Sequence, residues 1–251
     1  MLKISVVTAT YNCERTILST LESIRNQTYA AVEHVIMDGA SKDRTLEVIG
    51  HHKTRDTKVI SEADNGIYDA LNKGIRATSG DVIGLLHADD VFNSPDTLAR
   101  VAEAFADASI EAVYGDLVYV DAKDMGKVIR YWKAGQITPG KFRRGWMPPH
   151  PTVFVRSSVY RRLGVFDQQY KIAADYDLML RFLFAGSVKA AYLPIVITRM
   201  RVGGASNRSL KNIILKMRED YRVVRSNEVG GLMVLMYKNL TKIPQFWRRE
   251  R

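Results

Sequence analysis

Apolar and polar positions alternate in blocks along the first 110 residues, and the blocks predict strands that are each followed by a helix. In each helical block apolar side chains recur three or four positions apart, as Ile17, Leu21 and Ile24 do. Four such units predict a doubly wound α/β layer on a mostly parallel sheet. The predicted strands are short runs of mostly branched residues at 4–8, 35–37, 58–60 and 82–86.

The pattern changes after this layer. Two strand-like runs at 112–120 and 127–132 flank a polar segment and predict a β-hairpin that extends the sheet in the antiparallel sense. Residues 135–151 hold four of the seven prolines and predict a long loop. Loops of this length in compact domains usually have a function.

The C-terminal residues form a basic tail. Residues 201–251 hold twelve Lys or Arg and four Asp or Glu, and so carry most of the net charge of +10. Basic amphipathic helices bind anionic lipid surfaces, but helices packed on the domain or on a partner subunit would show the same spacing. The apolar positions of the tail are Leu210, Ile213, Ile214, Met217, Tyr221, Val224 and the run 232–237, followed by Phe246 and Trp247 beside Arg248 and Arg249.

Composition restricts the class of protein. A chain of 251 residues with 46% hydrophobic and 25% charged residues is typical of a globular protein with one large core. Cys13 is the only cysteine, so no internal disulfide forms. The chain starts without the basic region and cleavage site of a signal peptide, and it has no window of about 18 apolar residues. We expect a cytoplasmic protein. The charge lies in an apolar-striped tail without a recognition motif, so we expect no nucleic-acid partner.

The buried run Val82–Leu86 ends close to two adjacent carboxylates, Asp89 and Asp90. Ligands of open parallel sheets bind just beyond the carboxyl ends of the strands. Neighbouring carboxylates repel each other and lose hydration when buried, so they need a cation or strong hydrogen-bond donors. Mg²⁺ or Mn²⁺ with a phosphate-bearing ligand would supply both. A simple helix cap before Pro95 is the alternative.

Polar residues also follow the other three predicted strands. Because parallel strands end at one edge of a sheet, they predict a cleft that holds a ribose, a base and a metal-bound diphosphate. Neither G-x-G-x-x-G nor G-x-x-x-x-G-K-[ST] occurs, so phosphate is held in another way. The residues are Thr8, Thr10, Tyr11 and Asn12 after the first strand, Asp38 after the second, and Asp64, Asn65 and Gly66 after the third.

Six segments carry a combined pattern: SVVTATYN at 5–12, MDGASKD at 37–43, DNGIYDALNKG at 64–74, HADD at 87–90, HPTVF at 150–154 and ADYDLMLR at 174–181. Together they resemble the glycosyltransferase family 2 enzymes with the GT-A fold, of the polysaccharide-assembly type. The resemblance runs from residue 5 to about residue 201. It implies a GT-A catalytic domain over 1–205, with a nucleotide-binding half at 1–110, an acceptor half at 111–205 and a helical tail at 206–251.

The resemblance also implies roles for particular residues. Asp175 would be the catalytic base, Asp38 would contact the base of the nucleotide, and Asp89 would lie near the ribose. Asp90 would bind Mn²⁺ or Mg²⁺, with Asp89 and His150 as further ligand candidates. The remaining donor contacts would come from Thr8, Thr10, Tyr11, Asn12, Asp64, Asn65, Gly66, Asp69, Asn72 and Lys73, and the acceptor side would hold Trp146, His150 and Arg181.

The spacing of the residues around Asp175 gives evidence on this residue that does not depend on the resemblance. With Leu178, Met179 and Phe182 it stands at i, i+3, i+4 and i+7, so the four share one helical face while Asp177 points elsewhere. Partial burial beside other carboxylates would raise the pKa of Asp175 and make it a better proton acceptor. Without the resemblance, a helix cap is the simpler interpretation.

The reaction implied is a single displacement, in which a sugar moves from a nucleotide-diphosphate donor to an acceptor hydroxyl with inversion. The first expectation is a UDP-sugar donor and a saccharide or lipid-linked saccharide acceptor, the latter placing the protein at the inner face of the plasma membrane. Two departures, His87 for the usual Asp or Asn and Ala174 for the usual Glu, keep an inactive sugar-nucleotide-binding protein open. A nucleotidyltransferase is less favoured, because the first strand lacks a Gly-rich phosphate loop.

Overall fold

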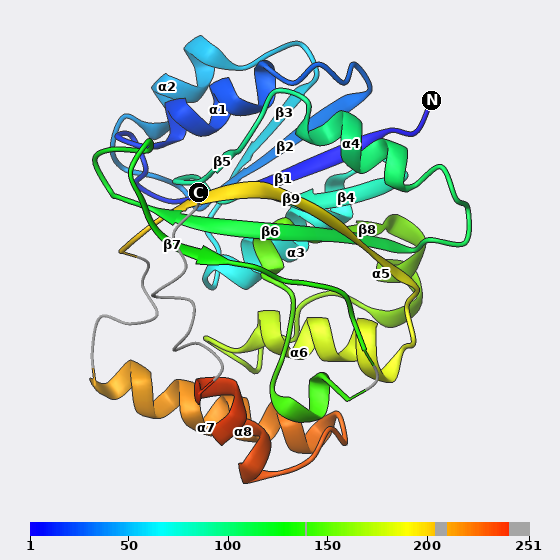
Figure 1. Cartoon of the computed structure of the whole chain (residues 1–251). Helices are drawn as coiled ribbons and strands as arrows, with labels where there is room; N and C mark the ends of the chain where they lie inside the picture. Colours follow the sequence, from blue (N-terminus) through cyan, green and yellow to red (C-terminus); the bar gives the residue numbers. More distant parts are fainter. Residues whose placement is uncertain (139, 204–209, 241–251) are drawn as a thin grey trace.

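The computed structural model describes residues 1–138, 140–203 and 210–240. Within them one nine-stranded sheet crosses the molecule in the order β3-β2-β1-β4-β8-β6-β9-β5, with β7 beside β6 (Figure 1). The first four strands are parallel neighbours, as the sequence predicts. They are β1 (Ile4–Thr10), β2 (Val32–Asp38), β3 (Thr57–Ser61) and β4 (Val82–Leu85), and the helices after them are α1 (Ile17–Arg25), α2 (Thr45–His52), α3 (Ile67–Ala77) and α4 (Thr97–Ala104).

Successive side chains of these strands face opposite layers of helices, because strand side chains alternate between faces. Val6 packs with Leu98 of α4, whereas Val7 packs with Leu71 of α3, and all four side chains are buried. The predicted doubly wound α/β layer is therefore confirmed.

The second half of the sheet is mixed. The predicted hairpin is confirmed as β6 (Ala112–Val120) and β7 (Val128–Trp132). Of three further strands that were not predicted, β8 (Phe154–Arg156) is antiparallel to β4 and β6, and β9 (Ala190–Arg201) is parallel to β6. β9 also pairs with the two-residue β5 (Val91–Phe92), which follows the acidic pair. This pairing brings the end of β9 to the carboxyl edge of β4.

The remaining helices cover the lower part of the molecule in Figure 1. The side chains of Val223, Val224, Val229, Val234 and Leu235 are buried in the same core cluster as the helix that carries Asp175. The described part of the tail therefore packs on the domain. The elements are η1 (Phe142–Arg144), η2 (His150–Thr152), α5 (Ser157–Leu163), α6 (Ala174–Leu180), the π-helical turn η3 (Arg181–Ala185), α7 (Leu210–Ser226) and α8 (Leu232–Leu240).

Parts of the predicted tail lie outside the described residues, namely the boundary at 205/206 and the residues Phe246, Trp247, Arg248 and Arg249. Among the helices that are described, none is long and apolar enough to cross a bilayer.

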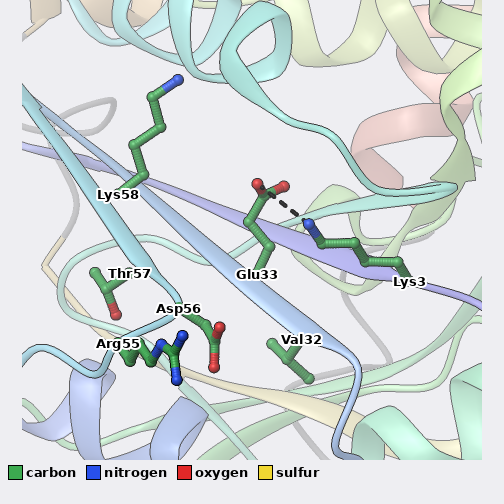
Figure 2. A pocket seen from close by; sticks show the side chains of 7 residues that line it. All are labelled: Lys3, Val32, Glu33, Arg55, Asp56, Thr57 and Lys58. Carbon is green, nitrogen blue, oxygen red and sulfur yellow. Dashed lines mark ion pairs between the residues drawn. The ribbon is translucent and has the colours of Figure 1, made fainter.

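A polar pocket of about 240 Å³ opens at the amino ends of β1, β2 and β3 (Figure 2). Lys3 and Glu33 form an ion pair across it at 3.6 Å. Parallel strands place their amino ends at the edge opposite to their carboxyl ends. The pocket therefore lies away from the strand ends at which the sequence predicts the ligand site.

Candidate active site

Asp38 joins the ends of the first three strands. Its carboxylate is 1% exposed and accepts hydrogen bonds from Thr10 Oγ1 at 3.1 Å, Ser61 Oγ at 2.7 Å and both the amide (3.0 Å) and the hydroxyl (2.5 Å) of Ser41. The backbone amide of Asn12 in turn donates to Ser41 Oγ at 2.9 Å. Asp38 thus holds the loops of the predicted donor edge together, and its contact with a nucleotide base stays a prediction.

Gly39 lies where the loops after β1, β2 and β3 meet. A Cβ at this position would collide with the Asp64 carboxylate and would lie 3.4 Å from the ring of Tyr11. Asp64 accepts a 2.8 Å hydrogen bond from the amide of Gly66, whose φ of +110° suits glycine. The absence of a side chain at Gly39 therefore lets residues of three strand ends approach one another.

Three predicted donor residues on α3 are paired within the protein. The Asp69 carboxylate accepts a hydrogen bond from the backbone amide of Asn65 at 3.1 Å and lies 3.4 Å from Lys73 Nζ. The Asn72 amide is buried and exchanges two hydrogen bonds, of 2.8 and 2.9 Å, with the backbone of Phe166. Asn72 therefore attaches the loop before α6 to α3, and a donor contact for it gains no support.

Two other predicted residues are engaged within the protein, Thr8 in the core and Trp146 partly buried against it. Thr8 is fully buried, and a 2.9 Å hydrogen bond joins its hydroxyl to His34 Nε2. Burial lowers the pKa of His34 to about 3. Trp146 donates from Nε1 to the carbonyl of Ala134 at 2.9 Å, with its ring edge-on to Tyr114. Trp146 thus anchors the proline-rich loop. This anchoring role is the alternative to stacking on a sugar ring.

Asp89 and Asp90 lie beyond β4 as predicted. Asp90 is 1% exposed; its Oδ1 accepts from the amide of Arg201 at 3.2 Å, and its buried Oδ2 has no hydrogen-bond partner in the described structure. Burial raises the pKa of Asp90 well above its ordinary range, and the charge of Asp89 raises it further. The Arg201 guanidinium donates to the carbonyl of Asp89 at 2.9 Å. This turn therefore stabilises a negative charge poorly.

His87, which begins this turn, forms a chain of contacts with His150 and Asp175. His150 Nδ1 lies 3.1 Å from Asp175 Oδ2, and its Nε2 lies 3.2 Å from His87 Nε2. A carboxylate only accepts, so His150 donates to Asp175 from Nδ1, and the direction of the hydrogen bond between the two Nε2 atoms depends on the tautomers of the rings. Burial lowers the pKa of His87 to about 4, which keeps it neutral. His150 and Asp175 retain 22% and 23% side-chain exposure, so the pair is reachable from solvent.

The expected rise in the pKa of Asp175 is wrong. Burial alone would raise this pKa, but the hydrogen bond and charge of His150, together with the charge of Lys238, lower it to about 2. The sequence pattern indicated burial but not the neighbours that outweigh it. Asp175 is therefore an ionised proton acceptor held by a histidine.

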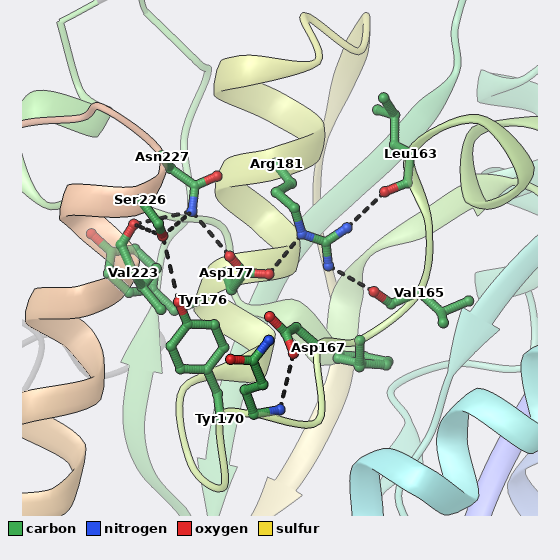
Figure 3. Close-up of polar contacts among 12 residues, drawn as sticks. Leu163, Val165, Asp167, Tyr170, Tyr176, Asp177, Arg181, Val223, Ser226 and Asn227 are labelled. Atoms are coloured by element: carbon green, nitrogen blue, oxygen red, sulfur yellow. Dashed lines mark hydrogen bonds and ion pairs between the residues drawn. The ribbon is translucent and has the colours of Figure 1, made fainter.

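Arg181 has a positioning role (Figure 3). Its guanidinium donates to Asp177 Oδ2 at 2.6 Å and to the carbonyls of Leu163 and Val165, each at 2.7 Å. Asn227, directly after α7, donates to the other oxygen of Asp177 at 3.0 Å. Asp177 thus points away from Asp175, as predicted, and the contacts of Arg181 fix α6. The acceptor-side role of Arg181 stays a prediction.

The C-terminal helices hold the start of α6, which sequence reasoning missed. Glu219 of α7 is buried and accepts hydrogen bonds of 2.8–3.0 Å from the three backbone amides at 171–173. Lys238 of α8 is buried, donates to Asp220 at 2.8 Å and lies 3.3 Å from the centre of the Tyr176 ring. No local signal marks these residues, because their partners lie far away in the sequence.

The β6–β7 hairpin adds two more residues that sequence reasoning missed. Arg130 lies 4.7 Å over the ring of Tyr119. Burial raises the pKa of Tyr119, the cation of Arg130 opposes this rise, and the charges of Asp90 and Asp175 add to it. Tyr119 of the hairpin is thus within electrostatic reach of both carboxylates.

A divalent cation fits the chemistry of Asp90, since the buried oxygen without a partner and the raised pKa both call for positive charge. Within the residues that the structure describes, no three His, Cys, Asp or Glu side chains are grouped to hold a metal. A Mg²⁺ ion commonly takes only one or two carboxylates and completes its shell with substrate phosphates and water.

The sequence profile described as glycosyl transferase family 2 matches residues 5–168. The chain therefore belongs to glycosyl transferase family 2. A PGL/p-HBAD biosynthesis glycosyltransferase of Mycobacterium bovis is 29% identical over 98% of both chains. An uncharacterized glycosyltransferase of Mycobacterium tuberculosis is 31% identical over 71% of this chain and 68% of its own.

Solved glycosyltransferases share the GT-A fold. TarS 1–349 of S. aureus, in complex with UDP-GlcNAc, matches 91% of this chain and 66% of its own with a TM-score of 0.70 and 18% identity. The chain spans 39% of the longer TarS chain. The mannosyltransferase PcManGT from Pyrobaculum calidifontis, in complex with GDP-Man and Mn²⁺, matches 100% of this chain and 76% of its own with a TM-score of 0.64 and 17% identity. The predicted fold class is thus confirmed.

Proposed function

We propose that this glycosyltransferase inverts the configuration of the transferred sugar and depends on a divalent cation. The observation that carries the proposal is the contact between His150 and Asp175 at 3.1 Å, on the side of the acidic turn at Asp89 and Asp90. This contact connects an ionised, solvent-accessible carboxylate to the sheet edge at which the parallel strands β1 to β4 end. An inactive binding protein would not need this pair.

In the proposed reaction Asp175 accepts the proton of an acceptor hydroxyl, whose oxygen attacks the anomeric carbon. His150 holds the carboxylate oriented through its Nδ1–H, and neutral His87 contacts the other ring nitrogen of His150. The bond to the nucleotide diphosphate breaks as the new bond forms, so the configuration inverts. General-base catalysis of this kind typically contributes about 10²–10⁴-fold to the rate.

Asp90 would hold the cation, Mn²⁺ or Mg²⁺, with Asp89 and His150 as further candidate ligands. A bound cation would neutralise the charge that develops on the leaving diphosphate. Tyr11, Asn12, Asp38, Asp64, Asn65 and Gly66 remain the proposed donor contacts, because they lie on the loops that Asp38 and Gly39 bring together.

The donor we propose is a nucleotide-diphosphate sugar, with a UDP-sugar first, since TarS was solved with UDP-GlcNAc and PcManGT with GDP-Man. The acceptor we propose is a saccharide or glycolipid hydroxyl; the Mycobacterium bovis relative is named for PGL/p-HBAD biosynthesis. A cytoplasmic location, at the inner membrane face for a lipid-linked acceptor, fits such a donor.

Calorimetric titration with UDP, GDP and ADP, each with and without Mn²⁺, tests the donor site. We expect one nucleotide to bind the wild type in a cation-dependent manner and to lose that dependence in Asp90→Ala. Asp124→Ala, which removes an exposed carboxylate of the hairpin turn, is the matched control and should bind as the wild type does. Binding of no nucleotide under either condition would refute the donor site.

A further inference from the structure

The outer surface of α7 carries an apolar stripe that no part of the described chain covers. Ile213, Ile214, Met217 and Tyr221 are spaced i, i+1, i+4 and i+8, so they share one side of the helix, and each is between 42% and 58% exposed. The buried Glu219, which holds the backbone before α6, and the buried Val223 lie on the opposite side of the helix, and the buried Val224 lies between the two sides. α7 therefore has an inner side that is buried against the domain and an apolar outer side that no described residue covers.

The outer surface of α8 is similar. Leu232, Met233, Met236 and Tyr237 are 66%, 70%, 59% and 46% exposed, whereas Val234 and Leu235 between them are buried. Among the described residues, eight of the thirteen exposed large apolar side chains lie on these two helices. Exposed apolar side chains gathered in this way mark an interaction surface.

The charges around this surface are positive. Both carboxylates of α7 face inward, where Glu219 accepts from the backbone before α6 and Asp220 pairs with Lys238. Arg218, Arg222 and Arg225, which are exposed, are spaced i, i+4 and i+7 and form the stripe beside the apolar one. The fold thus removes the negative charges of α7 from its outer surface.

The proline-rich loop adds two more cations. A Cβ at Gly145, directly after η1, would lie 2.5–2.6 Å from the backbone of Lys238, so η1 packs tightly on α8. Arg143 and Arg144 of η1 are exposed next to this contact. Exposed arginines from two distant parts of the chain therefore lie on α7 and on the segment packed against α8.

We propose that the outer face of α7 and α8 docks this enzyme on an anionic lipid bilayer. Exposed apolar side chains beside a row of arginines match the acyl boundary and the charged headgroups of such a surface. A second copy of the chain is a poorer occupant, because a two-fold contact through this face would bring the arginine rows of both copies together. Docking would bring the enzyme to a lipid-borne acceptor, which is one of the acceptors proposed above. Docking itself does not depend on the proposed reaction.

The inner side of these helices holds the base helix, through Glu219 and Asn227. A docked enzyme would therefore rest on the bilayer through elements that directly support α6. This places Asp175 at a fixed relation to the lipid surface, as transfer to a lipid-borne hydroxyl requires.

Flotation of the full chain with lipid vesicles, without donor or acceptor, tests the docking surface. We expect binding to vesicles of phosphatidylcholine mixed with phosphatidylglycerol that is at least about tenfold tighter than binding to phosphatidylcholine alone, and that weakens with salt. Arg218→Glu/Arg222→Glu should weaken it by about tenfold or more, and Met233→Glu/Met236→Glu should abolish it. The matched control is Lys53→Glu/Arg55→Glu, which reverses two exposed charges near the start of β3.

Circular dichroism and thermal unfolding show whether each variant is folded, so that the arginine pair still tests docking if the methionine pair does not fold. Absence of binding to anionic vesicles by the wild type, or equal loss in the control, would overturn the proposal. A dimer in light scattering that the face variants dissociate, without lipid binding, would assign the surface to a second copy instead. Because no donor is present, these outcomes are independent of the proposed reaction.

Discussion

The donor edge and the base helix are built in different ways. At the donor edge, polar residues follow strands in sequence order, and Asp38 joins neighbouring loops through hydroxyl groups. The base helix α6 is held by buried polar side chains from distant segments, such as Glu219 and Asn227. The comparison teaches that changes at the donor edge should mainly weaken ligand binding, whereas changes around α6 should affect both stability and rate.

The largest expected effect comes from Asp175 itself. Asp175→Asn should lower kcat by about 10²–10⁴-fold, because the amide cannot accept the hydroxyl proton. The thermal midpoint should change little, since the amide oxygen still accepts from His150. Steady-state transfer assays check the rate, with Asp107→Asn, which alters an exposed carboxylate beyond α4, as control. A variant that keeps the wild-type kcat would exclude Asp175 as the base.

The next effect combines a loss of stability with a loss of rate. Glu219→Ala leaves the three backbone amides at 171–173 without their acceptor and should lower the free energy of unfolding by about 3 kcal/mol. kcat should also fall, because α6 loses its support. Urea unfolding measures the first quantity. Glu103→Ala on the exposed side of α4 is the control, and equal stability of both variants would show that α7 does not hold α6.

Acid should destabilise the donor half through His34. The folded protein lowers the pKa of this histidine to about 3 by burial, against an ordinary value of 6.5. Its contribution to stability is therefore complete above pH 6.5 and is lost as the pH falls toward 3. Between pH 7 and pH 5 the loss should be about 2 kcal/mol. His34→Gln should flatten this slope in urea unfolding, whereas His51→Gln, at an exposed position, should retain it.

The smallest expected effect lies at the donor edge. Asp64→Ala should raise KM for the donor by about three- to tenfold, the value of one hydrogen bond, and should change stability by less than about 1 kcal/mol. Asp64 is only partly buried and accepts from the amide of Gly66. Donor titrations and urea unfolding together check both. A large loss of stability with unchanged KM would remove the contrast between the two regions.

Most of the first half of the fold was predictable from local pattern. Short apolar runs mark β1 to β4, which are buried between two layers of helices, and helical spacing marks the helices, which each bury one face against the sheet. β8 and β9 were not predicted: β8 has three residues, and β9 contains Pro194. Both depend on partners rather than on their own periodicity.

The candidate site divides in the same way. The sequence alone determined which residues follow the strands, the place of Asp89 and Asp90, and the face that Asp175 shares with its apolar neighbours, since these depend on covalent order and on the geometry of single elements. Tertiary structure alone decided that His150 lowers the pKa of Asp175, that Asn72 and Arg181 hold loops, and that α7 and α8 support α6 on one side while leaving apolar side chains exposed on the other. Such contacts join residues far apart in the chain, and their energies depend on burial and on neighbouring charges that no local pattern contains.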